Sequence, residues 1–239
     1  MWSTKLTRIV LSGVAALLLT AGLLAQSPLH ASERAVTLAA PELDNPKAAG
    51  PTQTVVLSGG CFWGVQGVYE HVRGVRRVVA GYAGGARDTA RYEMVGAGNT
   101  GHAESVQISF DPAEVSLGEI LRVFFSVAHD PTQLNGQGPD MGTQYRSEIF
   151  YSDAKQKQIA DAYIAQLTQS HAFARPIVTR VDSLPGFYPA EDYHQDFLIH
   201  HPSYPYIIYN DLPKIENLKR LFPDDYLTQP VMVSNVAAR

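Results

Sequence analysis

The chain has 239 residues, of which 45% are hydrophobic and 18% charged, with a formal net charge of −4 and one cysteine. A single cysteine excludes a disulfide framework, a CxxC redox pair and any zinc or iron–sulfur site built from several cysteines of one chain. The small acidic excess argues against a nucleic-acid-binding protein, which needs a basic excess on at least one face.

The first 31 residues have the pattern of a secretory signal peptide. Lys5 and Arg8 precede an apolar run over residues 9–25, and this stretch contains no acidic residue. A basic start, an apolar run and small residues at its end are typical of a signal that is removed on export. We therefore expect residues 1–31 to be cleaved and the protein to be exported to the periplasm. The alternative is an uncleaved membrane anchor, since the run reaches the short end of the roughly 17–25 residues that span a bilayer.

Residues 32–53 are rich in alanine and proline, with Pro41, Pro46 and Pro51, and show neither helical nor strand periodicity. This composition predicts a linker or extended arm. One folded domain, residues 54–239, is expected to follow.

Hydrophobic periodicity and turn residues define the elements of this domain. The segment 104–110 alternates apolar and polar residues as a half-buried strand does, and Gly74 is placed to end a helix. Ser116 and Glu119 have the spacing of a capping box at a helix start. In chain order we expect a strand at 54–57, a helix at 61–72, strands at 75–82 and 104–110, a helix at 116–128, a strand at 145–151, a helix at 153–169, a strand at 177–181, and helices near 191–200 and 214–221.

The order β-α-β-β-α-β, followed by α-β and a C-terminal extension, predicts the fold class. It is the pattern of an α+β protein, the ferredoxin-like split βαβ two-layer sandwich, in which helices cover one face of a sheet. The chain shows no internal repeat and no second domain. Because this architecture hosts many chemistries, function has to be inferred from particular residues.

The cysteine stands where the chain turns from a strand through Gly59-Gly60 into a helix. The amide groups and dipole of a helix N-terminus favour a thiolate, so we expect the pKa of Cys61 to be lowered. Phe62 and Trp63 follow directly and could form an apolar socket beside a nucleophile. The alternative is a structural cysteine among core aromatics, because free cysteines are often buried.

Several motifs follow one another along residues 54–222. They are Gly60-Cys61-Phe62-Trp63-Gly64, Gly81-Tyr82-Ala83-Gly84-Gly85, Tyr92-Glu93, Thr100-Gly101-His102-Ala103-Glu104, Phe110-Asp111-Pro112, His129-Asp130-Pro131-Thr132, the stretch from Asp140 to Ser147, and Glu191-Asp192-Tyr193-His194-Gln195. This ordered set resembles the A-type peptide methionine sulfoxide reductases, which repair the oxidised side chain of methionine.

The resemblance implies a role for each matching residue. Cys61 attacks the sulfoxide sulfur, and Glu104 protonates the oxygen. Tyr92 and Tyr145 direct hydroxyl groups to the same oxygen, and Asp140 orders that network. Without the resemblance, the two tyrosines would be interpreted as core or sheet residues, Asp140 as a turn residue and Glu104 as a charge at a strand edge.

The resemblance also implies that Phe62 and Trp63 hold the methyl group of the substrate. The expected substrates are methionine-S-sulfoxide, free or in oxidised proteins and peptides, and the protein is expected to act as a monomer. Four positions depart from the usual pattern and could alter rate or substrate preference: Met94, Gly96, Ala97 and Gly136.

Many members of this family carry further cysteines near the C-terminus, and residues 196–239 of this chain contain none. A sulfenic acid formed on Cys61 would therefore have no internal thiol to reduce it. We expect recycling by an external thiol, either a thioredoxin-like protein or a small thiol, and no bound cofactor or metal.

Three other functions are alternatives to this one. A Cys–His acyl transferase would use His102, His129 or His194 as its base. A metal-binding exported protein would use His194 and His201, which share a helix face. A chaperone-like protein would bind oxidised proteins without turnover.

Overall fold

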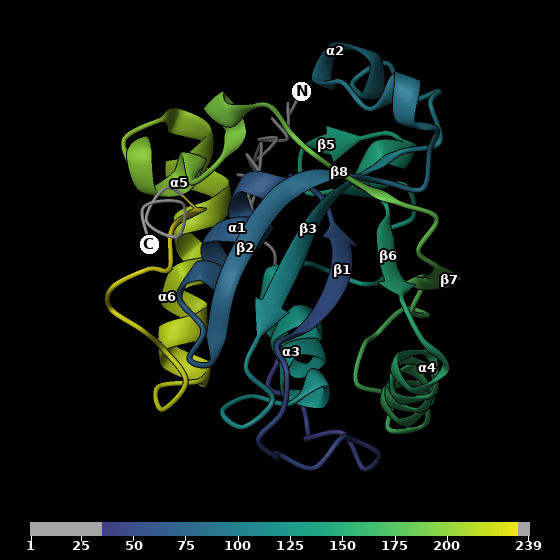
Figure 1. The fold of residues 1–239 in the computed structure, drawn as a ribbon, viewed down its shortest axis with the longest axis vertical. Coiled ribbons are helices and arrows are strands. Elements are labelled where there is room, and N and C mark those ends of the chain that lie inside the picture. The colour runs from purple at the N-terminus through teal and green to yellow at the C-terminus, as the bar shows by residue number, and fades with distance from the viewer. Residues whose placement is uncertain (1–34, 234–239) are drawn as a thin grey trace, which may run out of the picture.

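The computed structural model describes residues 35–233 (Figure 1). The predicted signal peptide therefore lies outside the described residues. Among residues 35–233, no helix combines the length and apolar character that crossing a bilayer requires.

A six-stranded mixed sheet forms the centre of the molecule, with the strand order β7-β6-β1-β3-β2-β8. Its pairings are antiparallel except for β6 with β7, which run parallel. The strands are β1 (Gln53–Gly59), β2 (Val75–Ala83), β3 (Ala103–Phe110), β6 (Ser147–Tyr151), β7 (Arg180–Ser183) and β8 (Phe187–Pro189). The structure is thus an α+β fold in which two added edge strands, β7 and β8, extend four central ones.

The four central strands, β6-β1-β3-β2, have the order of a split βαβ unit. Helix α1 (Phe62–Glu70) connects β1 to β2, which run in the same direction with β3 between them. Helix α3 (Leu117–Val123) lies between β3 and β6 in the chain and continues into a π-helical turn, Phe124–Ala128. As expected from the sequence, Ser116 and Glu119 form a capping box at its start.

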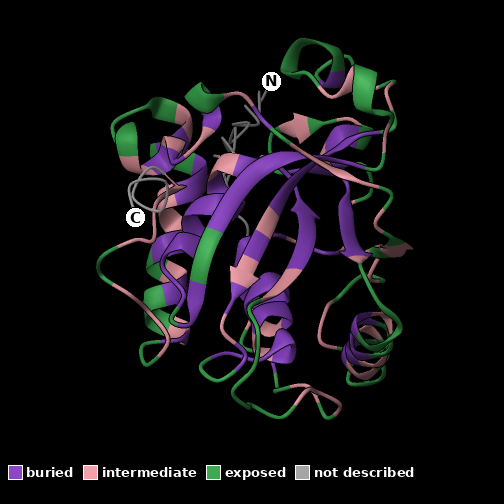
Figure 2. Ribbon diagram, viewed as in Figure 1, coloured by how far each residue is buried: buried purple, intermediate pink, exposed green. Residues whose placement is uncertain are grey.

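The main hydrophobic core lies between the sheet and the helices α1 and α3. Apolar residues of α1 and α3, among them Val68 and Ile120, are fully buried together with Val106 and Ile108 of β3. Figure 2 shows this burial running through the central strands, while most of the outer helical turns are exposed. Each such side chain contributes about 1.5–3 kcal/mol when it leaves water, so this layer supplies most of the stability.

Two further helices extend the layer. Helix α6 (Leu212–Leu221) packs against α1, and α4 (Ala154–Gln169) packs against α3, β6 and β7 (Figure 1). On the opposite face of the sheet, a small cluster of Val56, Ala83 and Phe150 is covered by Leu184 and Phe187.

The last predicted strand was misplaced by three residues. It was expected at 177–181, but β7 begins at Arg180. Ile177 packs on the main core from an irregular segment, and the Val178 amide donates to the Pro131 carbonyl at 2.8 Å. These apolar residues are covered by loop packing, so their hydrophobicity did not indicate a strand.

The predicted helix near 191–200 is two short pieces. A 3₁₀ turn, Asp192–His194, is separated from α5 (Phe197–His200) by Asp196, whose φ of 54° is left-handed. Sequence periodicity also missed four short elements: helix α2 (Tyr92–Val95), the edge strand β8, and the hairpin of β4 (Gly136–Gln137) with β5 (Asp140–Met141). Elements of two to four residues are too short to show a period.

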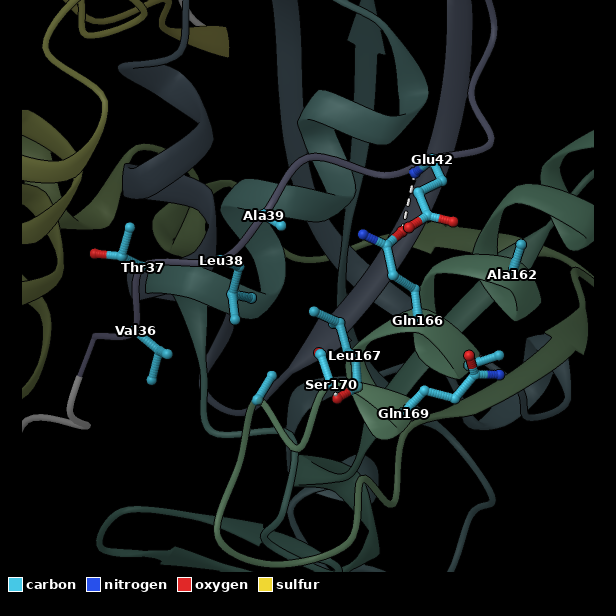
Figure 3. Close-up of a pocket in the computed structure, with 12 residues that line it drawn as sticks. Val36, Thr37, Leu38, Ala39, Glu42, Ala162, Gln166, Leu167, Gln169 and Ser170 are labelled. Carbon is cyan, nitrogen blue, oxygen red and sulfur yellow. Dashed lines mark hydrogen bonds between the residues drawn. The ribbon is translucent and has the colours of Figure 1, made fainter.

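Residues 35–52 contain no helix or strand and run across the outside of α3 and α4 (Figure 3). Leu38 is 4% exposed and joins the main core. The Arg122 Nε donates to the Leu38 carbonyl at 2.8 Å, and the Tyr163 hydroxyl donates to the Ala39 carbonyl at 2.9 Å. Asp44 accepts from the Gly118 amide at the start of α3. The segment is therefore an extended arm fastened to the domain.

Candidate active site

A cavity of about 220 Å³ opens at the N-terminus of α1. Its walls are formed by the turn between β1 and α1, the first turn of α1, helix α2, strand β3, the segment 140–145 and the segment after α5. The lining residues are Cys61, Phe62, Trp63, Tyr92, Glu104, Asp140, Tyr145, Tyr204 and Tyr206. All seven residues singled out from the sequence thus lie around one cavity, together with two tyrosines that were not assigned a role.

Cys61 is the N-cap residue of α1, directly after β1. Gly60 makes the tight turn, with a φ of 89°, and a Cβ there would stand 2.6 Å from the Cβ of Gln137. Glycine is therefore required on both conformational and steric grounds. The turn places the thiol of Cys61 at the end of a rigid strand, facing the cavity.

The prediction of a lowered pKa for Cys61 was wrong. Burial raises the pKa of this thiol well above its ordinary value, and the nearby carboxyls of Glu104 and Asp211 raise it further. A hydrogen bond from the Trp63 backbone amide, which is the contribution of the helix N-terminus, lowers the pKa but does not compensate. Without substrate, Cys61 is therefore held as a neutral thiol.

Glu104 lies on β3, the strand between β1 and β2, and is 3% exposed. Its Oε2 accepts a hydrogen bond from the Phe62 backbone amide at 3.0 Å, which ties the carboxyl to the first turn of α1. Burial raises the pKa of Glu104 to about 8, although that hydrogen bond lowers it. At neutral pH the carboxyl is mostly protonated and is able to act as an acid.

Hydroxyl groups surround the same space. Burial raises the pKa of Tyr92 and of Tyr145, and neighbouring carboxyls add to the shift, so both are hydroxyl donors at any physiological pH. The Tyr206 hydroxyl donates to the Asp140 Oδ2. Burial raises the pKa of Asp140, and this hydrogen bond lowers it. The cavity therefore has a polar side that offers hydrogen-bond donors.

The other side of the cavity is aromatic. Trp63 stacks on Phe197, with ring centroids 3.8 Å apart and planes 10° apart, and meets Tyr204 and Tyr206 edge-on. The indole Nε1 donates to the His194 Nδ1 at 3.1 Å. These contacts fix the Trp63 ring and leave an apolar wall next to the thiol.

Glu191 holds α2 against the site. Its Oε1 accepts from the Tyr92 backbone amide at 3.0 Å, and its Oε2 accepts from the Tyr82 hydroxyl at 2.8 Å. These bonds attach the exposed four-residue helix α2 to the sheet, and so position the Tyr92 side chain. Glu191 begins the motif Glu191-Asp192-Tyr193-His194-Gln195, but the sequence alone assigns it no role.

A buried ion pair lies behind the first turn of α1. The Lys214 Nζ is 3.7 Å from the Asp211 Oδ1, and both side chains are at least nine-tenths buried. A Cβ at Gly64 would stand 2.1 Å from that same oxygen, so only glycine lets α1 approach the pair. Burial raises the pKa of Asp211 to about 6, while Lys214 lowers it. Sequence periodicity gave no signal for this pair, because its neighbours come from 150 residues earlier in the chain.

The histidines of the alternative hypotheses have other partners. His102 bonds to the Gly85 amide and the Ala86 carbonyl, and His129 bonds to the Phe124 carbonyl and Ser147. His194 bonds to Trp63. Within residues 35–233, no group of three or more histidine, cysteine, aspartate or glutamate side chains is arranged to hold a metal ion.

The cavity brings one thiol beside a buried, protonated carboxyl. The family model for peptide methionine sulfoxide reductase matches residues 53–226. This chain belongs to that family.

Relatives and solved structures agree with this assignment. The chain is 60% identical over 187 residues to peptide methionine sulfoxide reductase MsrA 2 of Mesorhizobium japonicum, covering 78% of this chain and 96% of the relative. It is 52% identical over 178 residues to MsrA 2 of Synechocystis, covering 74% and 83% of the two chains. Reduced Mxr1 from Saccharomyces cerevisiae has a TM-score of 0.57 at 32% identity, covering 68% and 92%. Methionine sulfoxide reductase A of Corynebacterium diphtheriae has a TM-score of 0.55 at 31% identity, covering 72% and 88%.

Proposed function

We propose a residue-level mechanism for the activity of this family member, a peptide-methionine (S)-S-oxide reductase. The observation that carries it is the meeting of one thiol, Cys61, and one buried protonated carboxyl, Glu104, at a single cavity. Sulfoxide reduction needs both groups, because the sulfur is attacked while its oxygen gains a proton.

In the proposed step, the Cys61 sulfur attacks the sulfoxide sulfur, and the oxygen passes to Cys61. The thiol becomes a sulfenic acid and the substrate becomes a thioether, so Cys61 is oxidised and methionine is restored. Glu104 protonates the oxygen as the sulfur–sulfur bond forms. The proton of the Cys61 thiol replaces the one that Glu104 gives, so the step consumes no proton overall.

The rest of the cavity orients the substrate. Tyr92 and Tyr145 direct hydroxyl groups to the sulfoxide oxygen, and Asp140 orders this network through Tyr206. Phe62 and Trp63 hold the methyl group against the aromatic wall. An apolar contact at this position discriminates a methyl group from a polar substituent, and the fixed positions of oxygen and methyl select one sulfoxide epimer.

Recycling then depends on an external thiol, since Cys61 is the one cysteine of the sequence. A thioredoxin-like protein or a small thiol reduces the sulfenic acid through a mixed disulfide. Oxidised proteins and peptides are the substrates, because Tyr92 and Tyr204 at the cavity are 36% and 48% exposed and leave the site open to a chain.

We also propose export to the periplasm with loss of residues 1–31, on the basis of the basic and apolar N-terminal pattern. Fractionation of cells that produce the full chain, with N-terminal sequencing of the product, tests this. A full-length product in the cytoplasm would refute export, and one retained in the membrane would favour the anchor.

The activity is tested by mass spectrometry of a methionine sulfoxide peptide incubated with the protein and dithiothreitol. We expect loss of one oxygen from one epimer only, and no loss with Cys61→Ser. If the wild-type protein removes no oxygen under reducing conditions, the proposal fails.

A further inference from the structure

Cys61 borders a second, much smaller cavity besides the one described above. This second cavity measures about 10 Å³ and lies between the turn of the β4–β5 hairpin and the segment leading into α6. Its lining residues are Cys61, Gln137, Gly138, Pro139, Tyr206, Asn210 and Lys214. Cys61 and Tyr206 are the residues common to both cavities, so Cys61 lies at the boundary between them.

The two cavities differ in the polar groups they offer. The larger one holds carboxyl and hydroxyl groups, whereas the second has the ammonium of Lys214 and the amide of Asn210. Asn210 is 8% exposed, and its Nδ2 donates to the Tyr206 carbonyl at 3.0 Å. Its buried Oδ1 accepts no hydrogen bond from the residues that the structure describes. A buried acceptor is costly to leave unpaired, so the second cavity is built to meet a hydrogen-bond donor.

The recycling reaction requires a defined direction of attack. A thiolate that displaces an oxygen from sulfur approaches opposite to the bond that breaks. In the proposed mechanism the oxygen reaches Cys61 from the side of Glu104, inside the larger cavity. The thiolate therefore has to approach Cys61 from another side, and the second cavity is another space that Cys61 borders.

We propose that the external thiol attacks the Cys61 sulfenic acid through the second cavity, where Lys214 attracts the incoming thiolate and Asn210 accepts a hydrogen bond from an incoming thiol. The inference rests on the proposed function. In this step a sulfur–sulfur bond forms between the thiol and Cys61, and the sulfur–oxygen bond breaks. The thiol first loses its proton to solvent, and its thiolate attacks. The oxygen leaves as water with a proton from Glu104, which solvent then restores, so the thiol is oxidised and Cys61 is reduced to the mixed disulfide. A second thiol then releases Cys61.

A thiol enters the second cavity only if the cavity wall moves, because the cavity measures about 10 Å³. The hairpin that carries Gln137 and Gly138 has two-residue strands and forms its own sheet, separate from the six-stranded one. Opening this wall breaks the hydrogen bonds between Gln137 and the Asp130 backbone, at 3.1 and 2.7 Å, and that of the Gly138 amide to Gln133. The opening is therefore a local unfolding of the hairpin. Two exposed apolar side chains of this region, Leu134 and Met141, are 69% and 72% exposed, and Tyr209 beside Asn210 is 67% exposed.

An introduced thiol tests the direction of attack. Asn210→Cys is given one equivalent of methionine sulfoxide without reductant, and methionine and disulfide are measured by mass spectrometry. We expect a disulfide between Cys61 and the introduced thiol in step with methionine formation. Tyr204→Cys, which places a thiol on the larger cavity, is the control and should form this disulfide at least about tenfold more slowly. Methionine formation without a disulfide in Asn210→Cys, or equal rates in both variants, would overturn the proposal.

Lys214→Met tests the role of the cation by separating the two half-reactions. We expect the first methionine, measured in a single turnover, to form more slowly by a smaller factor than recycling, because Lys214 also pairs with Asp211 behind α1. Recycling with dithiothreitol or with a purified thioredoxin and its reductase should slow by about tenfold or more. Lys214→Arg should recover most of the rate, and Lys219→Met, an exposed lysine on the same helix, should change neither step.

The assays with dithiothreitol and with thioredoxin distinguish the two sources of the thiol. A slower recycling rate with thioredoxin alone indicates that Lys214 contacts the protein surface of the reductant. A slower rate with both thioredoxin and dithiothreitol indicates that Lys214 attracts the thiolate itself. Either result supports the route. An unchanged recycling rate in Lys214→Met refutes it. Failure of wild type to form the first methionine would instead refute the proposed function.

Discussion

Burial dominates the chemistry at the scale of single residues. Cys61 and Glu104 are both kept neutral, although a helix N-terminus faces the thiol and a backbone amide bonds to the carboxyl. In each case the loss of water outweighs the one favourable hydrogen bond. Both groups therefore carry their protons before substrate binds. Glu104 can then supply the proton that the sulfoxide oxygen needs. We infer that burial keeps Cys61 and Glu104 uncharged so that this proton is available for transfer.

Replacing Glu104 with glutamine tests its role as an acid. The amide keeps the shape and a hydrogen bond but is a far weaker acid, so the single-turnover rate should fall by about 10²–10⁴. Substrate affinity should change little, because binding does not require the proton. Rapid-quench measurements of methionine formation against substrate concentration separate the two effects. A rate equal to that of wild type would remove Glu104 from this role.

The wild-type rate should also depend on pH. Because the pKa of Glu104 is about 8, its protonated form predominates below that pH and is lost above it. The single-turnover rate should therefore hold between about pH 6 and 7 and fall as the pH rises through 8. A rate that rises across this range would contradict the assignment.

Stability should respond to the same group with a defined sign. The folded pKa of Glu104 is about 8 and its ordinary value is 4.5, so the folded state binds the proton more tightly. Stability contributed by the protonated carboxyl is fully present below pH 4.5 and declines as the pH rises to 8. Relative to wild type, Glu104→Gln should gain stability over this window. Urea unfolding of both proteins at a series of pH values measures the difference, and parallel pH profiles would contradict it.

At the scale of elements, the site depends on helix α1 being placed against two tight neighbours. Gly60 allows the turn beside Gln137, and Gly64 allows the close approach of Asp211. The short helix α2 is tied to β2 through Glu191, which accepts one hydrogen bond from the Tyr92 amide and one from the Tyr82 hydroxyl. Small residues and buried carboxylates thus set the position of the thiol relative to the rest of the cavity.

Gly64→Ala tests the packing of α1 on the Asp211–Lys214 pair. The added Cβ would overlap the Asp211 Oδ1, which is only 2.1 Å away, so α1 and the segment at 211 must separate. We expect a loss of about 1–3 kcal/mol in the free energy of unfolding, together with slower methionine formation. Urea unfolding and single-turnover assays measure both. Gly50→Ala, whose nearest contact is an ordinary 3.8 Å, is the control and should change the stability by less than about 0.5 kcal/mol.

At the scale of the whole molecule, the arm at residues 35–52 and the segment after α5 wrap the split βαβ unit from two sides. The arm covers α3 and α4, far from the cavity, while the later segment supplies Tyr204 and Tyr206 to the cavity itself. The first is expected to contribute stability and the second to contribute chemistry.

Leu38→Ala tests the contribution of the arm. Removing a buried leucine side chain should lower the free energy of unfolding by about 2–4 kcal/mol, since the core closes only partly over the cavity that remains. The single-turnover rate should not change under native conditions, because Leu38 does not line the active-site cavity. Leu134→Ala, at a position 69% exposed, is the matched control for stability. Equal unfolding midpoints for the two variants would show that the arm is only loosely attached.

The sequence by itself determined the order of the long elements, the helix start at Ser116 and Glu119, and, through its motifs, seven of the nine residues that line the cavity. Periodicity and motifs are local, so they can be observed in one chain. The tertiary structure alone decided the neutral state of Cys61, the contribution of Tyr206 and the closeness of Lys214 to the thiol. These depend on burial and on contacts between segments distant in the sequence, and a pKa follows the surroundings of a group rather than its place in the sequence.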